Sequence, residues 1–250
     1  MKTLTITITI SLLILLSNNP SIGQDAYVLL QKMDQLMQAP KDKQGNIKII
    51  LSNLKSGKIK EREAIMKQKG KDKRLYQYTK PESQAGIATL SLPDGVMWMY
   101  MPAFGKPKKI SLLSKSQAFT GTDFSYEDME SKSYSERYIA SFIEEEDLTY
   151  AIELVPKSDK SKYSRIIAHV HITDNYPVLM EYFDKGNKKF KEATYKYKYS
   201  GQYWYAEVVV MTDLKKEHST TIEMKDVKFD QGLSDDEFTV ESLVPAKEEE

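Results

Sequence analysis

Residues 86–101, GIATLSLPDGVMWMYM, decide the fold class of this chain. The segment has two apolar halves, and Pro93-Asp94-Gly95 separates them. An Asp-Gly pair between two such runs is a strong hairpin signal, because both residues tolerate the positive φ that a tight turn requires. The segment therefore predicts two adjacent antiparallel strands.

The same pattern extends along most of the chain. From Asn46 onward, apolar residues recur at every second position, and turn-forming residues divide the runs. After the hairpin, further strands are predicted at 138–145, 148–155, 165–173, 178–184, 190–199, 205–212 and 219–229. Sequential strands with short turns are typical of an antiparallel meander, so we expect a mainly β protein built on one large curved sheet.

Only residues 25–37 carry a convincing helical pattern. Apolar residues at three-and-four spacing form a single stripe that must pack against the sheet, namely Leu29, Leu30, Met33, Leu36 and Met37. Pro40 prevents the helix from continuing. Residues 102–135 have no clear period. A segment of that length inside a compact domain is usually functional or contains a short helix, so we expect it to form part of a lid.

The strand at 96–101 is apolar on both faces. Val96, Trp98 and Tyr100 share one parity, while Met97, Met99 and Met101 share the other. A sheet with one wet face alternates apolar and polar residues instead. Two interpretations remain open. The strand lies in the core of a sandwich, or one face lies under a helix and the other lines an apolar hollow.

The N-terminus has the features of a secretory signal sequence. Lys2 precedes an uncharged apolar run at 3–16, and Ser21 and Gly23 are small residues at the positions that signal peptidase reads. The run is shorter than the roughly 20 apolar residues of a membrane-spanning helix. We therefore expect residues 1–23 to be a signal peptide and residues 24–250 to form one exported domain.

Composition and motifs argue against several function classes. Lys and Arg number 36 and Asp and Glu also number 36, which disfavours a nucleic-acid binder. The chain has no cysteine, no nucleophile elbow and no phosphate-binding glycine loop. His169 and His171 share one strand face but have no third ligand nearby in sequence. We expect no metal, no cofactor and no catalytic activity.

Two contiguous motifs carry a family resemblance. Residues 94–110, DGVMWMYMPAFGKPKKI, and residues 119–128, FTGTDFSYED, resemble the signatures of the periplasmic outer-membrane lipoprotein-sorting family, in the group related to the lipoprotein carrier. The order of elements also matches: an export signal, a helix, a meander and a Leu-Ser-Asp-x-x-Phe ending at 233–238. The known carriers use an arginine to hold the lid closed, and the two motifs do not place a matching arginine in this chain.

The resemblance implies a half-open barrel whose hollow takes the acyl chains of a lipid or lipoprotein in the periplasm, for transfer toward the outer membrane. An inner-membrane exporter and an outer-membrane acceptor would then be its partners. The residues expected to border the hollow are Met97, Trp98, Met99, Tyr100, Phe104, Phe119 and Phe124, with Met33 and Leu36 from the helix. The alternative is an exported interaction module that binds a membrane exporter or envelope complex through a sheet edge and carries no lipid.

The export signal gives a first testable prediction. Cleavage after Gly23 leaves Gln24 as the first residue of the mature protein, because Ser21 and Gly23 fit the peptidase site. N-terminal sequencing of the exported protein checks this. A membrane-retained chain that still begins at Met1 would contradict it.

Overall fold

The computed structural model describes residues 22–245, so the expected signal sequence lies almost entirely outside the described residues. Side chains are described from Ala26 onward, apart from those of residues 112 and 113. Among the described residues, no helix is long and apolar enough to cross a membrane.

The described chain forms one antiparallel sheet of 13 strands. They are β1 (Asp42–Asn53), β2 (Ile59–Lys69), β3 (Lys73–Lys80), β4 (Ala88–Leu92), β5 (Val96–Tyr100), β6 (Lys108–Lys109), β7 (Tyr138–Glu145), β8 (Thr149–Pro156), β9 (Arg165–His171), β10 (Pro177–Phe183), β11 (Lys189–Ser200), β12 (Tyr203–Asp213) and β13 (His218–Phe229). The predicted fold class, a mainly β protein with a large, curved antiparallel sheet that does not close, is confirmed.

The hairpin predicted at residues 86–101 is β4–β5. Leu92 pairs with Val96, and the residues between them form a tight turn. Asp94 and Gly95 both adopt positive φ, at 59° and 70°, which is the backbone region that Asp and Gly tolerate best. The Asp-Gly signal in the sequence therefore has a direct backbone cause.

The spatial order of the strands is β6-β5-β4-β3-β2-β1-β13-β12-β11-β10-β9-β8-β7. The first and last long strands, β1 and β13, pair at the centre of the sheet, and the two edges are β6 and β7. A bulge at Gln44 and Asn46 bends this central pair. Gly45 sits in the bulge, where a Cβ atom would lie 2.9 Å from the carbonyl oxygen of Lys225. The sheet can curve here because that position has no side chain.

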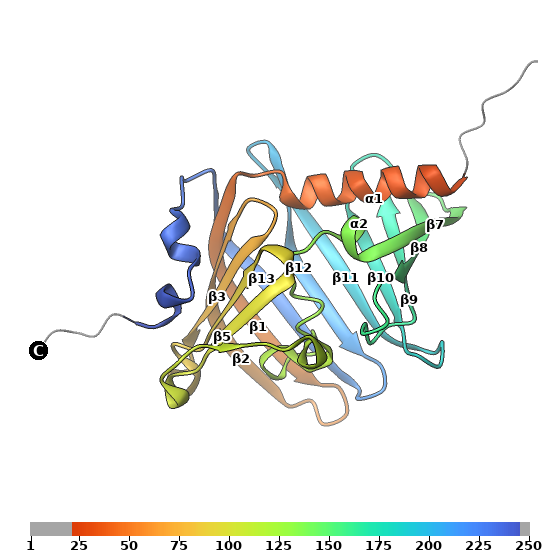
Figure 1. Cartoon of the computed structure of the whole chain (residues 1–250). Coiled ribbons are helices and arrows are strands. Elements are labelled where there is room, and N and C mark those ends of the chain that lie inside the picture. Colours follow the sequence, from red (N-terminus) through yellow and green to blue (C-terminus); the bar gives the residue numbers. More distant parts are fainter. Residues whose placement is uncertain (1–21, 246–250) are drawn as a thin grey trace, which may run out of the picture.

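Helix α1 (Ile22–Gln38) crosses one end of the curved sheet (Figure 1). It packs mainly against β7, and also against α2 (Tyr134–Arg137) and β12. Its buried face consists of Ala26, Leu29, Leu30 and Met33, with Met37 partly buried beside them. Leu36 is half-buried on the flank of this face, because three residues after Met33 the helix has turned by about 300°.

The C-terminal segment packs on the convex face of the sheet (Figure 1). Leu233, Phe238 and Leu243 are buried against Leu90 and Tyr100. The segment contains a short 3-10 helix at Asp235–Phe238 whose Ser234 and Glu237 form a capping box. This cover explains why the strand β5 is apolar on both faces.

Residues 110–137 connect β6 to β7, which are the two edges of the sheet. The connection must therefore span the open side of the half-barrel. It contains 3-10 turns and α2 rather than a long helix, and part of it lies on the concave side, where Phe119, Phe124 and Met129 join the core. We call residues 110–137 the connecting segment.

Asp34 joins α1 to the connecting segment. Its buried carboxylate accepts hydrogen bonds from the backbone N–H groups of Tyr134 and Ser135, each at 2.8 Å. Asp34→Ala leaves both donors without their acceptor, so we expect the free energy of unfolding to fall by about 1–3 kcal/mol. Urea unfolding measures the change, and Gln35→Ala, on the exposed side of the helix, is the control. Equal midpoints for the two variants would show that this contact does not hold the helix in place.

Candidate functional site

A cavity of ≈ 170 Å³ lies on the concave side of the sheet. Its walls come from β1, β2 and β3 on one side and from β11, β12 and β13 on the other. Met37 of α1 and Phe124, Asp128, Met129 and Tyr134 of the connecting segment complete the lining. We call this cavity the hollow.

Most of the lining is aromatic or apolar. Strand β11 contributes Tyr195 and Tyr197, while the other rings and the methionines come from six different elements: Tyr76, Phe124, Tyr134, Trp204, Tyr205, Met37, Met66, Met129 and Met224. Methionine is unbranched and polarizable, so it adapts to irregular apolar ligands. The lining therefore suits a flexible hydrocarbon better than a rigid polar molecule.

The tyrosines of β11 are held by other rings. Tyr197 stacks on Tyr176 with ring centroids 4.4 Å apart, and Tyr176 stacks on His171 at 5.0 Å. The hydroxyl of Tyr195 donates to the sulfur of Met180 at 3.4 Å. Burial raises the pKa of both Tyr195 and Tyr197, so these two phenols stay neutral.

Two cations also line the hollow, Lys43 from β1 and Arg74 from β3. Burial, with a smaller effect from the charge of Arg74, lowers the pKa of Lys43 to about 7. The carboxylate on the same lining, Asp128, is engaged elsewhere. One of its oxygens accepts from the Tyr163 hydroxyl at 2.6 Å, and the other accepts from the backbone N–H of Ser125 at 2.7 Å.

Polar contacts anchor the connecting segment to the sheet. Arg62 of β2 donates to the carbonyl oxygen of Thr120 at 2.6 Å. The buried carboxylate of Asp123 accepts from the hydroxyl of Thr220 at 2.7 Å and lies 2.6 Å from Nδ1 of His218. Lys191 donates to the carbonyl oxygen of Asp123. Side chains of β2, β11 and β13 thus hold this part of the cover in place.

The structure divides the residues that the sequence placed around the hollow. Met33, Met97, Phe119 and Phe124 belong to one buried cluster on the concave side, and Met99 packs against that cluster. Of the nine residues, Phe124 is the one on the lining of the cavity itself.

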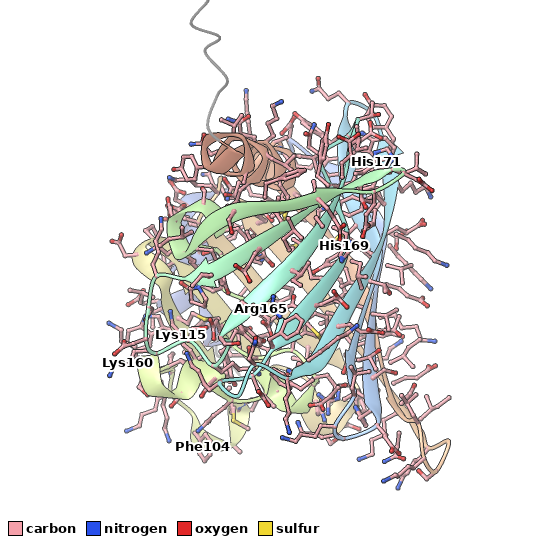
Figure 2. All side chains as sticks on the ribbon, turned by 90° about the vertical axis from the view of Figure 1, so that its right-hand side faces the viewer. Phe104, Lys115, Lys160, Arg165, His169 and His171 are labelled. Carbon is pink, nitrogen blue, oxygen red and sulfur yellow. The ribbon has the colours of Figure 1, made fainter. Side chains whose placement is uncertain are left out.

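The remaining four lie elsewhere. Trp98 and Tyr100 point to the convex face, where they pack with the C-terminal segment, because successive side chains of a strand point to opposite faces. Phe104 is 55% exposed with the ammonium of Lys108 above its ring, and Figure 2 shows it at the lower margin of the molecule. Leu36 lies on the flank of α1.

Sequence reasoning missed Lys43, Arg74 and Met129 as lining residues. The sequence did contain a signal for the tyrosines, since Tyr195 and Tyr197 alternate with lysines and so share one face. It did not contain the pairing of β1 with β13, which brings the N-terminal and C-terminal strands around one hollow.

The two strand histidines lie outside the hollow. His169 and His171 are on the outer side of β9, with Arg165 on the same strand (Figure 2). His169 lies 3.1 Å from a carboxylate oxygen of Glu146 and 3.5 Å from one of Glu181. Within residues 22–245 no group of three or more His, Cys, Asp or Glu side chains is placed to hold a metal ion.

Comparison with known proteins identifies a family to which the chain belongs. A family model described as uncharacterized-protein-like matches residues 70–244, which is more than half of the chain. No curated protein matches the chain.

Solved structures share the fold over nearly the whole chain. A Vibrio parahaemolyticus domain named for outer membrane lipoprotein sorting superposes with a TM-score of 0.83 and 25% identity, over 89% of this chain and 100% of that one. A DUF1329 family protein from Desulfovibrio piger has a TM-score of 0.83 at 24% identity, over 89% and 99% of the two chains. A LolA superfamily protein from Nitrosomonas europaea has a TM-score of 0.73 at 20% identity, over 86% and 97%.

The match to the Vibrio domain agrees with the motifs at 94–110 and 119–128 and with the helix-covered, open antiparallel sheet. The chain therefore belongs to the family whose model matches residues 70–244. It has the LolA-like lipoprotein-sorting fold.

Proposed function

We propose that this protein is a periplasmic carrier that holds the acyl chains of a lipid or lipoprotein in the hollow and passes them toward the outer membrane. The observation that carries the proposal is the hollow itself, an apolar and methionine-rich cavity beneath the connecting segment. A donor at the inner membrane and an acceptor at the outer membrane would be its partners. The mature domain would be the exported residues 24–250, acting without catalysis.

Hydrophobic burial supplies the affinity. Each methylene that leaves water contributes about 0.8 kcal/mol, so a chain of a dozen carbons gains roughly 10 kcal/mol before the costs of binding. The tyrosine and methionine walls make apolar contacts with the bound acyl chain and do not require it to adopt one specific shape. A carrier must also release its cargo, and a hollow of adaptable side chains avoids the rigid fit that slows release.

Binding of a whole acyl chain would require the cover of the hollow to move. Ligand pockets usually measure roughly 300–1,000 Å³, whereas a cavity near 150 Å³ holds one benzene ring. At ≈ 170 Å³ the hollow takes the end of an acyl chain. A longer chain needs Phe124 and Met129 of the connecting segment to withdraw, which would open the space toward Phe119, Met97 and Met99.

The edge strand β7 supports a second candidate function. Ile139 and Val155 pair across β7 and β8 and are 59% and 39% exposed, and Ile143 further along the same edge is 43% exposed. An exposed apolar sheet edge can bind another chain by strand addition. In that case the protein is an exported interaction module. Lipid extraction separates the two functions, since a pure interaction module taken from the periplasm without detergent yields no bound acyl chains.

Adjacent residues of β12 provide a matched test of the hollow. Val209 lines the cavity, whereas Val210 points to the other face of the sheet and lies outside the lining. Val209→Trp fills the hollow and excludes at least two methylenes of a bound chain. We expect the affinity for a fluorescent fatty acid to fall tenfold or more. Val210→Trp should bind like the parent.

Fluorescence titration of the parent and both variants gives the result, and thermal unfolding shows that each variant is folded. Equal affinity in all three proteins would place the lipid outside the hollow. No binding by the folded parent would contradict the carrier function itself.

A further inference from the structure

A row of polar side chains crosses the concave face beside the hollow. Lys43 of β1 pairs with Gln68 of β2, and Gln68 pairs with Arg74 of β3. All three line the hollow, next to the apolar row that contains Met66 and Tyr76. The hollow thus has a cationic end and an apolar body.

The two cations of this row have no anionic partner. In the part of the chain that the structure describes, the ammonium of Lys43 makes no hydrogen bond or ion pair, and Nε of Arg74 is buried without a hydrogen-bond partner. Gln68 between them donates its amide to the carbonyl oxygen of Gly70 at 3.2 Å.

Two other lysines with little exposed side-chain surface are paired in the described residues. Lys191 donates to the carbonyl oxygen of Asp123, and Lys115 donates to Glu130 at 2.9 Å and to the carbonyl oxygen of Gly95 at 2.6 Å. An unpaired buried cation is costly, and natural proteins usually pair such a group or neutralise it. Lys43 and Arg74, which are both half-buried, are the exception, and an anion from outside the chain would complete their contacts.

We propose that the hollow binds an amphiphile with one anionic head group, which lies between Lys43 and Arg74 while its hydrocarbon tail lies along the tyrosine and methionine walls. This inference rests on the proposed function and names its ligand class. The head group completes the hydrogen bonds that the two cations lack, and the tail uses the apolar body. A neutral amphiphile of the same chain length leaves both cations unpaired, so the site discriminates against it.

The same geometry makes binding depend on pH. The charged groups that face Lys43 across the hollow are Arg74 and Asp128, and the tyrosines that face it are Tyr76, Tyr134, Tyr195, Tyr197 and Tyr205. Burial raises the pKa of Tyr134, Tyr195 and Tyr197, so these remain neutral. The pKa of Lys43 lies at about 7 in the empty hollow.

An anion beside the ammonium raises the pKa of Lys43 and favours the protonated form. Affinity for the anion is therefore greatest below pH 7 and falls as the pH rises above 7, by up to tenfold per pH unit until the pKa of the bound state is reached.

Displacement of the neutral fluorescent probe 1-N-phenylnaphthylamine tests the inference. Dodecane-1-sulfonate, whose charge does not change with pH, is compared with dodecan-1-ol and with inorganic phosphate. At pH 6 we expect the sulfonate to displace the probe about tenfold better than the alcohol, and phosphate to displace none. Between pH 6 and pH 9 the preference for the sulfonate should shrink.

Lys43→Met and Arg74→Met should each lose most of this preference, which is a ratio of two competitors and so does not depend on how tightly each variant binds the probe. Lys60→Met, which removes an exposed lysine of β2, is the control and should keep the preference. A folded Lys43→Met variant should also lose the pH dependence, which provides a readout independent of absolute affinity.

The outcomes separate the two proposals. If the probe binds but the sulfonate and the alcohol compete equally at every pH, the anionic head site is wrong and the apolar hollow remains. If phosphate alone displaces the probe as well as the sulfonate does, the site holds a free anion and the amphiphile assignment is wrong. If neither probe nor amphiphile binds, the carrier function fails.

Discussion

The rest of the structure depends on one topological constraint: the two edges of the open sheet, β6 and β7, are consecutive in the chain. The central pairing of β1 with β13 produces this arrangement, because it joins two meanders whose free ends then face each other. The connecting segment at 110–137 has to bridge those ends. Since part of it lies on the concave side, the curved sheet gains a core and a cover from the same stretch of chain (Figure 1).

The backbone N–H and C=O groups of an irregular cover need hydrogen-bond partners. Side chains of the sheet supply many of them. Arg62, Lys191 and the Asp123 pairing with His218 and Thr220 hold one part of the connecting segment, while Asp34 of α1 holds another. Further side-chain contacts join Thr120 to Tyr78, Ser131 to Ser91 and Asp128 to Tyr163. Displacing the cover would break these side-chain contacts but leave the backbone hydrogen bonds of the sheet in place.

Polar and apolar side chains occupy different parts of the interior. Tyrosine and methionine side chains form most of the hollow, and the cations of β1 and β3 sit at one end. Elsewhere in the described interior, buried lysines meet carbonyl or carboxylate oxygens, as Lys115 does with Glu130. The hollow therefore has two different ends, one lined by the unpaired cations and one by apolar side chains. A uniformly apolar core has no such polarity.

The sequence by itself determined most of the strands, the β4–β5 turn and the N-terminal helix, because each depends on residues close together in the chain. It did not decide which face of β5 looks inward, since both parities of that strand are apolar. Only the tertiary structure assigned Met97 to the concave core and Trp98 to the C-terminal cover, because the C-terminal segment returns to the convex face. Likewise, Lys43 and Arg74 become neighbours of one hollow through strand register, which single-sequence patterns do not contain.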